Sequence, residues 1–403
     1  MQKQELRTPC YVIQEKKLRE NLQILKGVKD RTGCRILLAQ KAFSMYSVYP
    51  LLGEYLDGTT ASGLYEARLG YEEMGKENHI FSPAYREDEM EEILKYCGHV
   101  VFNSPSQLRK YGKLAKRSGR STGLRINPEC STQEGHAIYD PCAPHSRLGV
   151  TESQFLREMM EEDVQMLDGL HFHTLCEQNA DALAQTLEAV EEKFGRYMYN
   201  MKWVNFGGGH HITREDYDIG LLEKCIRHVK ETYGVEVYLE PGEAVALNAG
   251  SLFTQVLEVV ENGMKIAILD TSAACHMPDV LEMPYRPPLK GAWEPEKDET
   301  YEPGSTYQNS GSPYRDSDLH RASSWVYRLA GPTCLAGDVI GDYAFAHPLA
   351  PGDILEFQDM AIYTMVKNNT FNGMKLPDIV LEREDGSFQM IREFGYEDFK
   401  CRL

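Results

Sequence analysis

WVNFGGGHHITREDYDIGLLEKCIRHVKETYGVEVYLEPG, residues 203 to 242, contains a strand, a helix and a second strand in one uninterrupted unit. The runs WVNF and VEVYLE are rich in the β-branched and aromatic residues that favour strands. REDYDIGLLEKCIRHVK, which lies between them, repeats its apolar residues every three or four positions, as an amphipathic helix does. Two strands joined through a helix are typical of a parallel sheet covered by helices.

Similar units extend from this stretch back to about residue 14. The further strand-like runs are RILLAQ (35 to 40), DGTTAS (57 to 62), HIFS (79 to 82), HVVFN (99 to 103), TGLRIN (122 to 127) and LDGLHFH (167 to 173). Helix candidates between them include 86 to 97, 104 to 117 and 180 to 198, and TESQ at 151 to 154 has the pattern of a capping box. Eight such units close into a TIM-like (β/α)₈ barrel. An open doubly wound sheet is the weaker interpretation, because no G-x-G-x-x-G follows the first strand.

After about residue 246 the pattern changes to strand-like runs without long helices between them. These runs include SLFTQVLEVVEN, KIAILDTS, SSWVYRLAG, DILEFQDM, DIVLER and FQMIREF. We therefore expect a barrel over 14 to 245 and a mainly β domain over 246 to 403, with residues 1 to 13 pairing with the β domain. The segment 283 to 323 is rich in Pro, Gly, Ser and charge, which predicts a long loop.

Composition narrows the classes of function. The net charge of −18, from 61 acidic and 43 basic residues, repels nucleic acid and anionic membranes. The chain has neither a run of ~18 apolar residues nor the start of a secretory signal. Its ten cysteines form no C-x-x-C pair and no clustered zinc-site spacing. These features predict a cytoplasmic protein without a resident metal.

In a barrel of this kind the active site forms at the carboxyl ends of the strands. Lys41 directly follows RILLAQ. An ammonium at the end of an otherwise apolar strand must reach solvent or be neutralised by a covalent or electrostatic partner. Attachment of a cofactor would neutralise Lys41, and a side chain that extends to water is the other interpretation.

Other strand ends carry reactive residues as well. Gly207 to Gly209 have no Cβ, so their N–H groups could approach a phosphate, although a plain turn uses the same residues. His171 and His173 share one face of LDGLHFH, where either could point into the barrel or pack in its core. Glu240 ends its strand, and a carboxylate there needs a partner such as a protonated ring nitrogen.

The β domain adds two candidates. GPTC at 331 to 334 places Cys334 after a Gly-Pro turn, and MAIYTMVKNNTFNG at 360 to 373 contains Tyr363. Considered alone, Cys334 fits a small buried side chain better than a reactive thiol.

Taken together, these segments resemble the alanine-racemase-like, fold type III pyridoxal-phosphate decarboxylases of ornithine, diaminopimelate and arginine. Six motifs carry the resemblance over nearly the whole chain and in the family's order, namely LLAQKAF, LHFHT, GGG, LEPG, GPTC and the segment around Tyr363. The resemblance implies catalytic roles for Lys41, His173 and Cys334, and cofactor contacts for Lys41, His173, Gly207, Gly208, Gly209, Glu240 and Tyr363.

In detail, the resemblance implies that Lys41 carries pyridoxal phosphate covalently and that His173 stacks on its pyridine ring. Glu240 is implied to bind the ring nitrogen, and the three glycines and Tyr363 to bind the phosphate. Cys334 is implied to reach the site across a homodimer interface and to return a proton to the substrate. The predicted enzyme is therefore a homodimer whose active sites are shared between its subunits.

Two positions depart from the ornithine and diaminopimelate members, which usually have arginine after EPG and an acid after the GPTC cysteine. Here these positions are Glu243 and Leu335. EPGEA, MPYRPP and several other segments are closest to members whose substrate is an amino acid with a cationic polyamine tail. Such a tail needs anionic partners, for which we predict Glu243 and Asp279. Asp279 is equally compatible with an acid in a solvated loop.

Two other interpretations stay open. The chain could be a diaminopimelate, ornithine or arginine decarboxylase, or a racemase on the same barrel. Leu335 and Glu243 count against the decarboxylases, and the sequence identifies no second base for a racemase. From another class, it could be a protein that holds pyridoxal phosphate without turnover, but such relatives lack the β domain.

Overall fold

The computed structural model describes residues 5–133, 140–295 and 325–403. It divides the chain into two compact units, one formed by Arg19–Val245 and the other by the residues up to Leu18 together with Ala246–Leu403. The part of the predicted loop from residue 296 to 323 lies outside the described residues. No helix among the described residues has the length and apolar character needed to cross a membrane.

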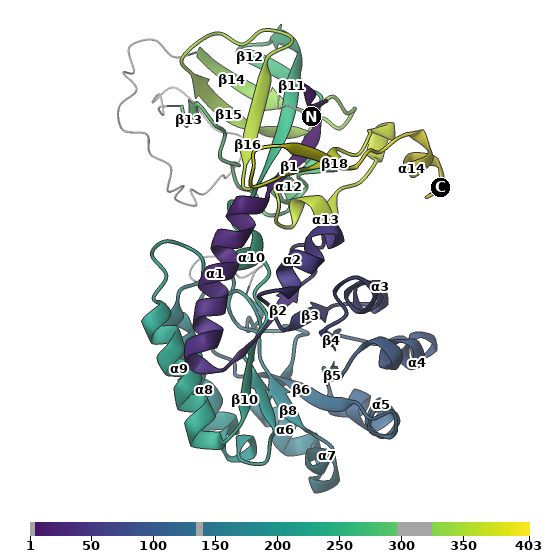
Figure 1. Ribbon diagram of the computed structural model, residues 1–403, viewed down its shortest axis with the longest axis vertical. Helices are drawn as coiled ribbons and strands as arrows, with labels where there is room; N and C mark the ends of the chain where they lie inside the picture. Colours follow the sequence, from purple (N-terminus) through teal and green to yellow (C-terminus); the bar gives the residue numbers. More distant parts are fainter. Residues whose placement is uncertain (1–4, 134–139, 296–324) are drawn as a thin grey trace. The chain divides into compact units, whose positions relative to one another are not determined.

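Eight parallel strands of the first unit form a closed barrel (Figure 1), as the eight strand-like runs predict. They are β2 (Arg35–Ala39), β3 (Gly58–Ala61), β4 (Glu77–Phe81), β5 (His99–Phe102), β6 (Ser121–Asn127), β8 (Gly169–His171), β9 (Trp203–Asn205) and β10 (Glu236–Leu239). β2 pairs with both β3 and β10, and β5 pairs with both β4 and β6, so the ring of hydrogen-bonded strands has no open edge. A further short strand, β7 (Val150–Thr151), pairs with the end of β6.

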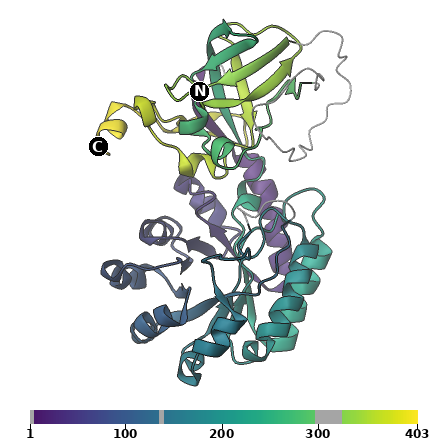
Figure 2. The same cartoon turned by 180° about the vertical axis from the view of Figure 1, so that it is seen from behind.

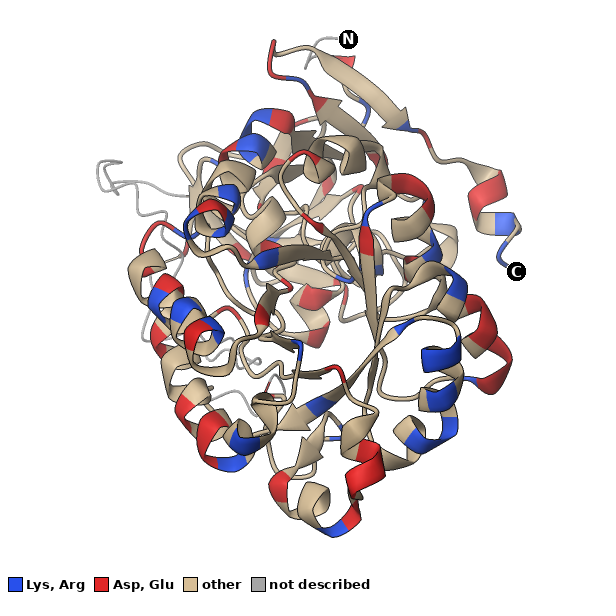
Figure 3. Ribbon diagram, turned by 60° about the horizontal axis from the view of Figure 1, so that its bottom comes forward, with Lys and Arg blue, Asp and Glu red and all other residues tan. Residues whose placement is uncertain are grey.

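Helices surround these strands, as the view from behind in Figure 2 also shows. They are α1 (Glu15–Thr32), α2 (Tyr49–Gly53), α3 (Leu64–Leu69), α4 (Glu87–Tyr96), α5 (Pro105–Arg117), α6 (Glu152–Glu158), α7 (Glu161–Gln165), α8 (Ala180–Met198), α9 (Ile219–Tyr233) and α10 (Glu243–Ala246). Acidic and basic residues are interspersed along these helices (Figure 3). Many of these charged residues are exposed, as is usual for such side chains.

The predicted capping box at the start of α6 is only half formed. The Thr151 hydroxyl accepts a hydrogen bond from the Gln154 N–H at 3.3 Å, as an N-cap residue does. The Gln154 side chain does not complete the box, because it donates forward to Glu158 at 3.2 Å. The first residue of the motif was therefore predicted correctly and the reciprocal bond was not.

The interior of the barrel is filled around one indole ring. Trp203 is 3% exposed, and its Nε1 donates to the Ser121 hydroxyl at 2.9 Å. A Cβ atom on Gly169 would lie 2.1 Å from the Trp203 ring, and one on Gly123 would lie 2.3 Å from it. Two neighbouring strands, β6 and β8, therefore need glycine so that one large side chain can fill the barrel.

The second unit is built on a mixed sheet. Its strands are β1 (Cys10–Gln14), β11 (Gly250–Glu261), β12 (Lys265–Leu269), β13 (Ala292–Trp293), β14 (Trp325–Ala330), β15 (Val339–Phe345), β16 (Ile354–Gln358), β17 (Asp378–Glu382) and β18 (Phe388–Arg392). β1 pairs antiparallel with β11 and parallel with β17, so the amino-terminal strand joins the two parts of this sheet. Its core includes Tyr11, Tyr327 and Phe357, all fully buried or nearly so.

Short helices complete this unit, namely α11 (Ala273–His276), α12 (Asp279–Glu282), α13 (Thr364–Lys367) and α14 (Tyr396–Lys400). The fold class predicted from the sequence, an α/β barrel with a mainly β domain, is confirmed.

Candidate active site

A pocket opens among the carboxyl ends of the barrel strands. It is lined by Ala39, Lys41, Thr60, Ala61, Ser62, Phe81, Arg125, His171, His173 and Glu240. Three residues predicted from separate strand ends, Lys41, His173 and Glu240, thus line one pocket. The parallel arrangement explains this, because all strands end at the same face of the barrel.

Lys41 lies two residues beyond the end of β2, lines the pocket and is partly accessible to solvent. The protein atoms around its amine and the nearby charge of Arg125 lower the pKa of Lys41, and Glu240 and Glu243 only partly offset this effect. A lowered pKa increases the fraction of uncharged amine, which is the nucleophilic form.

Glu240 is a buried carboxylate, 6% exposed, with two side-chain partners. Asn205 Nδ2 donates to its Oε1 at 2.8 Å, and His171 Nε2 lies 3.2 Å from its Oε2. Burial alone would favour the neutral acid, but the contacts with His171 and Asn205 lower the pKa of Glu240 below its usual value. The pocket therefore contains a fully ionised carboxylate at neutral pH.

His173 is held by the glycine loop. Its Nδ1 accepts a 2.9 Å hydrogen bond from the Gly208 N–H, so Nδ1 is the unprotonated nitrogen of the ring. Burial and the charges of Lys41 and Arg125 keep the pKa of His173 well below its usual value. His173 is accordingly a neutral ring of fixed orientation that lines the pocket.

The three glycines lie against the ends of neighbouring strands. A Cβ atom on Gly207 would be 2.5 Å from the Phe172 carbonyl oxygen, and one on Gly208 would be 2.5 Å from the Glu240 carbonyl oxygen. The Gly207 N–H donates to the Asn205 side chain and the Gly208 N–H to His173. Of the three N–H groups, only that of Gly209 has no acceptor among the described residues. A Cβ atom on Gly209 would lie 2.0 Å from the Leu175 carbonyl oxygen, so close packing explains all three glycines. The phosphate contact stays a prediction, with the Gly209 N–H as the available donor.

Glu243 begins α10, three residues after Glu240. Its Oε2 lies 3.3 Å from Nε2 of His211, and this carboxylate raises the pKa of His211 despite the opposing effect of burial. The charge of Glu243 also acts to raise the pKa of Lys41 and the pKa of Cys176. Glu243 therefore lies close enough to Lys41 to affect its pKa and has a titratable partner in His211. Its contact with the substrate stays a prediction.

The remaining predicted residues belong to the second, mainly β unit, which we call the β unit. Cys334 is exposed, and its N–H donates to the Asn372 side chain at 2.9 Å. Tyr363 precedes α13 with a φ of 54°, a left-handed conformation that a bulky residue rarely adopts. Asp279 Oδ1 lies 2.5 Å from Lys367 Nζ. A cation of the chain thus already accompanies Asp279, and the roles of all three residues stay predictions.

Sequence reasoning assigned no role to three side chains that contact the predicted residues. Asn205 bonds both Gly207 and Glu240, and His171 bonds Glu240. The guanidinium of Arg125 lies 4.5 Å from the centre of the Phe81 ring and donates to the His173 carbonyl oxygen at 3.1 Å. The period of two along β6, β8 and β9, counted back from the strand ends, could have placed them on the inner face.

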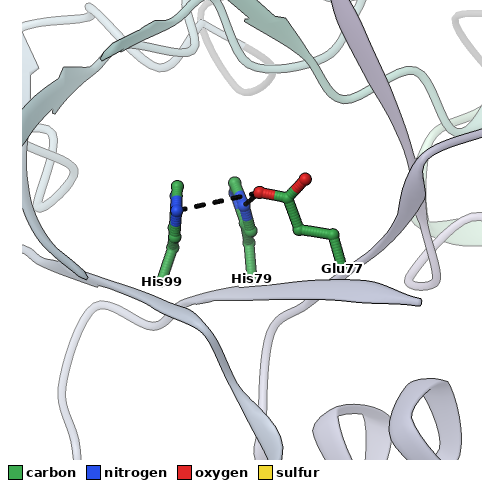
Figure 4. A group of neighbouring side chains, drawn as sticks. All are labelled: Glu77, His79 and His99. Carbon is green, nitrogen blue, oxygen red and sulfur yellow. Dashed lines mark hydrogen bonds and ion pairs between the residues drawn. The ribbon is translucent and has the colours of Figure 1, made fainter. Parts of the chain in front are cut away.

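A second group of titratable side chains, Glu77, His79 and His99, lies at the amino ends of β4 and β5 (Figure 4). Glu77 Oε1 is 2.9 Å from His79 Nε2 and accepts from the Tyr238 hydroxyl at 2.9 Å. The two imidazole rings stack with centroids 3.9 Å apart and an interplanar angle of 22°. His99 Nε2 also lies 3.7 Å from Glu77 Oε1, so this carboxylate oxygen is a shared partner of both rings. The group is a packed hydrogen-bonded layer of the barrel interior.

The first unit is a closed parallel barrel whose pocket contains a buried carboxylate and an amine of lowered pKa, and the second unit is built on a sheet. These features together define a class of enzyme. A family model described as "Pyridoxal-dependent decarboxylase, C-terminal sheet domain" matches residues 10–361. The chain belongs to this family of pyridoxal-dependent decarboxylases. The predicted enzyme class, a decarboxylating lyase, is confirmed.

Individual relatives are similar over the full length. The chain is 44% identical over 399 residues to the carboxynorspermidine/carboxyspermidine decarboxylase of Campylobacter jejuni, covering 99% of each sequence. It is 38% identical over 400 residues to the carboxyaminopropylagmatine decarboxylase of Synechocystis, covering 99% of this chain and 96% of the relative. The crystal structure of the Campylobacter jejuni carboxynorspermidine decarboxylase complexed with norspermidine superimposes with a TM-score of 0.86 at 43% identity, over 99% of this chain and 100% of that one.

Proposed function

We propose that this protein catalyses the pyridoxal-phosphate-dependent decarboxylation of carboxynorspermidine and carboxyspermidine, giving norspermidine and spermidine in polyamine biosynthesis. The observation that carries the proposal is the 44% identity, over 99% of both chains, to an enzyme named for these two substrates. The Glu243 and Leu335 positions, which depart from the ornithine and diaminopimelate members, support the same substrate class.

Pyridoxal phosphate fits the residues of the pocket. An amine of lowered pKa, Lys41, suits covalent attachment of an aldehyde, and the ionised Glu240 suits a protonated ring nitrogen. His173 offers a neutral ring face that its bond with Gly208 keeps in one orientation. Gly209 offers a backbone donor to the phosphate, and the family resemblance adds Tyr363 to the phosphate contacts.

When bound, pyridoxal phosphate supplies an electron sink that accepts the electron pair left at Cα as the bond to the carboxylate breaks and CO₂ departs. Glu240 favours this step because an anion beside the ring nitrogen holds a proton there. Cys334, supplied by a second copy of the chain, then gives its thiol proton to Cα and regains a proton from water. Arg125, a buried cation beside His173, favours the anionic groups that the reaction brings into the pocket.

We propose that two acidic residues select the substrate. Carboxynorspermidine carries ammonium groups beyond its amino-acid end, and a charge-assisted hydrogen bond to such a group adds both affinity and selectivity. Glu243 lies close enough to Lys41 to influence its pKa, which supports a position beside the bound substrate. Asp279 is the second proposed acid, and a substrate cation would compete there with Lys367.

A second candidate function is decarboxylation of carboxyaminopropylagmatine, which the 38% identity to the Synechocystis enzyme supports. Diaminopimelate, ornithine and arginine remain weaker candidates because of Glu243 and Leu335. A protein that only holds the cofactor is a weaker candidate still, since the similarity to decarboxylases includes the β unit.

We further propose that the enzyme is a cytoplasmic homodimer whose two active sites each use Cys334 of the other copy. The free cysteines of the described residues suit a reducing compartment. The exposure of Cys334 suits a residue that acts on a second copy of the chain.

The deciding experiment is CO₂ release from carboxynorspermidine, carboxyspermidine, carboxyaminopropylagmatine, diaminopimelate, ornithine and arginine under identical conditions. We expect the first two to have the highest kcat/KM. They differ from each other by one methylene, which is worth only about 1–3 kcal/mol in discrimination. A higher kcat/KM for any other compound would overturn the proposed substrate, and CO₂ release from none of them would overturn the proposed activity.

A further inference from the structure

The Glu240 carboxylate is held from two sides. Asn205 donates to Oε1 at 2.8 Å and His171 Nε2 lies 3.2 Å from Oε2. Both partners are buried, with Asn205 fully inaccessible and His171 2% exposed. An amide is a neutral donor, so the charge that Glu240 retains depends on whether His171 is an imidazole or an imidazolium.

The surroundings of His171 decide its protonation. Its Nδ1 is buried and has no hydrogen-bond partner among the described residues. A buried N–H without an acceptor is unfavourable, so the proton of the ring belongs on Nε2, where Glu240 accepts it. The ring stacks on Phe81 with centroids 5.6 Å apart at 14°, and the Arg125 guanidinium also lies over Phe81. A cation this close disfavours a second positive charge on His171.

We propose that His171 is a positioning residue for cofactor binding: as a neutral Nε2–H tautomer it orients Glu240 without neutralising it. The inference rests on the proposed contact between Glu240 and the cofactor ring nitrogen. A positively charged His171 would compete with a protonated ring nitrogen for the same carboxylate, whereas a neutral donor leaves the full negative charge available. Asn205 and His171 occupy one lone pair on each oxygen, and the remaining lone pairs can accept from the ring.

The barrel contains a matched histidine for comparison. His79 is also buried, and its Nε2 lies 2.9 Å from Oε1 of Glu77 (Figure 4), compared with 3.2 Å between His171 and Glu240. His79 does not line the pocket. A change at His79 therefore tests the general cost of altering a buried histidine and glutamate pair in this barrel.

The first test measures pyridoxal-phosphate affinity by titrating the apoprotein and following its tryptophan fluorescence. His171→Leu removes the donor and should weaken binding by about tenfold or more, as expected for a lost hydrogen bond to a charged group. His171→Gln keeps an N–H donor and should stay within about threefold of the unaltered protein, as should His79→Gln. Equal affinity in His171→Leu and the unaltered protein would overturn the proposal.

The second test needs no cofactor. In the apoprotein labelled with ¹⁵N-histidine, His171 should give the nitrogen shifts of the neutral Nε2–H tautomer throughout the neutral pH range. An imidazolium or an Nδ1–H tautomer would overturn the proposal even if His171→Leu failed to fold. The Glu240→Gln variant distinguishes failure of the role proposed for His171 from failure of the cofactor contact proposed for Glu240. Loss of affinity in Glu240→Gln but not in His171→Leu rejects only the role of His171, whereas no loss in Glu240→Gln rejects the role proposed for Glu240.

Discussion

Nδ1 of His173 accepts a 2.9 Å hydrogen bond from the backbone N–H of Gly208. Because Nδ1 accepts this bond, the proton of the neutral ring lies on Nε2, and the bond also fixes the plane of the ring that lines the pocket. The bond depends on a residue without a side chain. A Cβ atom at position 208 would lie 2.5 Å from the Glu240 carbonyl oxygen and 3.1 Å from Cε1 of His173. Strand β10 and His173 are thus positioned by the same glycine.

Gly208→Ala should therefore weaken pyridoxal-phosphate binding by about tenfold or more, because both His173 and Glu240 must move. Titration of the apoprotein with the cofactor measures the change. Gly98→Ala is the control, since its added Cβ would meet only the Asn78 carbonyl oxygen, at 3.9 Å. Equal loss in both variants would point to a general loss of stability rather than to the ring of His173.

Lys41→Ala should abolish decarboxylation and the visible absorbance of the bound cofactor, because it removes the amine proposed to hold it. Borohydride reduction of the unaltered enzyme should fix the cofactor on the peptide that contains Lys41, as mass spectrometry can check. Lys113→Ala, a change at an exposed helix position, should keep both the absorbance and the labelled peptide. Activity together with visible absorbance in Lys41→Ala would refute the assignment.

Glu243→Gln should raise KM for carboxynorspermidine more than it lowers kcat, because the lost interaction is with a part of the substrate that does not react. The loss of a charge-assisted hydrogen bond predicts a rise in KM of about tenfold. The same variant should lower the pKa of His211, since Glu243 is what raises it. Glu231→Gln, on the exposed face of α9, is the control, and an unchanged KM in Glu243→Gln would exclude Glu243 from the substrate site.

A homodimer with shared sites predicts complementation between inactive variants. Lys41→Ala and Cys334→Ala are each expected to be inactive or nearly so, but a heterodimer would contain one site with both residues intact. Mixing them should restore up to about a quarter of the activity if the subunits exchange at random. Native mass spectrometry can demonstrate the exchange. No recovery after proven exchange would show that each site draws both residues from one chain.

The periodicity of the sequence predicted the eight barrel strands because most of them are apolar runs between helix and turn signals, with DGTTAS the weakest of the eight. It missed β15, whose Gly341 and Asp342 are poor strand formers. In the structure Asp342 lies opposite Arg328 on β14, and Arg328 Nε donates to its carboxylate at 2.8 Å. That cross-strand pair, which a single strand does not reveal, offsets the unfavourable propensity.

The candidate site shows the same limit. Lys41, His173 and Glu240 could be predicted because each ends a strand, and parallel strands end together. His171 and Asn205 were not assigned roles, because their contacts with Glu240 depend on which strands are neighbours in the closed barrel. The pairing of Asp279 with Lys367 likewise joins residues that lie 88 positions apart in the sequence.

Stability at low pH should depend on Asp168, which precedes β8 and accepts hydrogen bonds from Lys116, from Lys202 and from the Thr122 N–H. Burial opposes ionisation, but these partners lower the pKa of Asp168 from 3.8 to about 2. A carboxyl whose pKa is lower in the folded state stabilises the protein above its unfolded pKa, and this contribution is lost as the pH falls through the folded pKa.

Asp168→Asn should therefore lower the free energy of unfolding by about 1–2 kcal/mol at neutral pH, after allowance for solvent screening of the two lysines. The difference from the unaltered protein should shrink steadily as the pH falls below 3.8 toward 2, since both proteins then carry a neutral group at this position. Urea unfolding at a series of pH values measures it. Asp216→Asn, which removes only an exposed pair with Arg214, should have little effect at any pH. A difference that stays constant with pH would show that Asp168 stabilises the barrel through its shape and hydrogen bonds rather than through its charge.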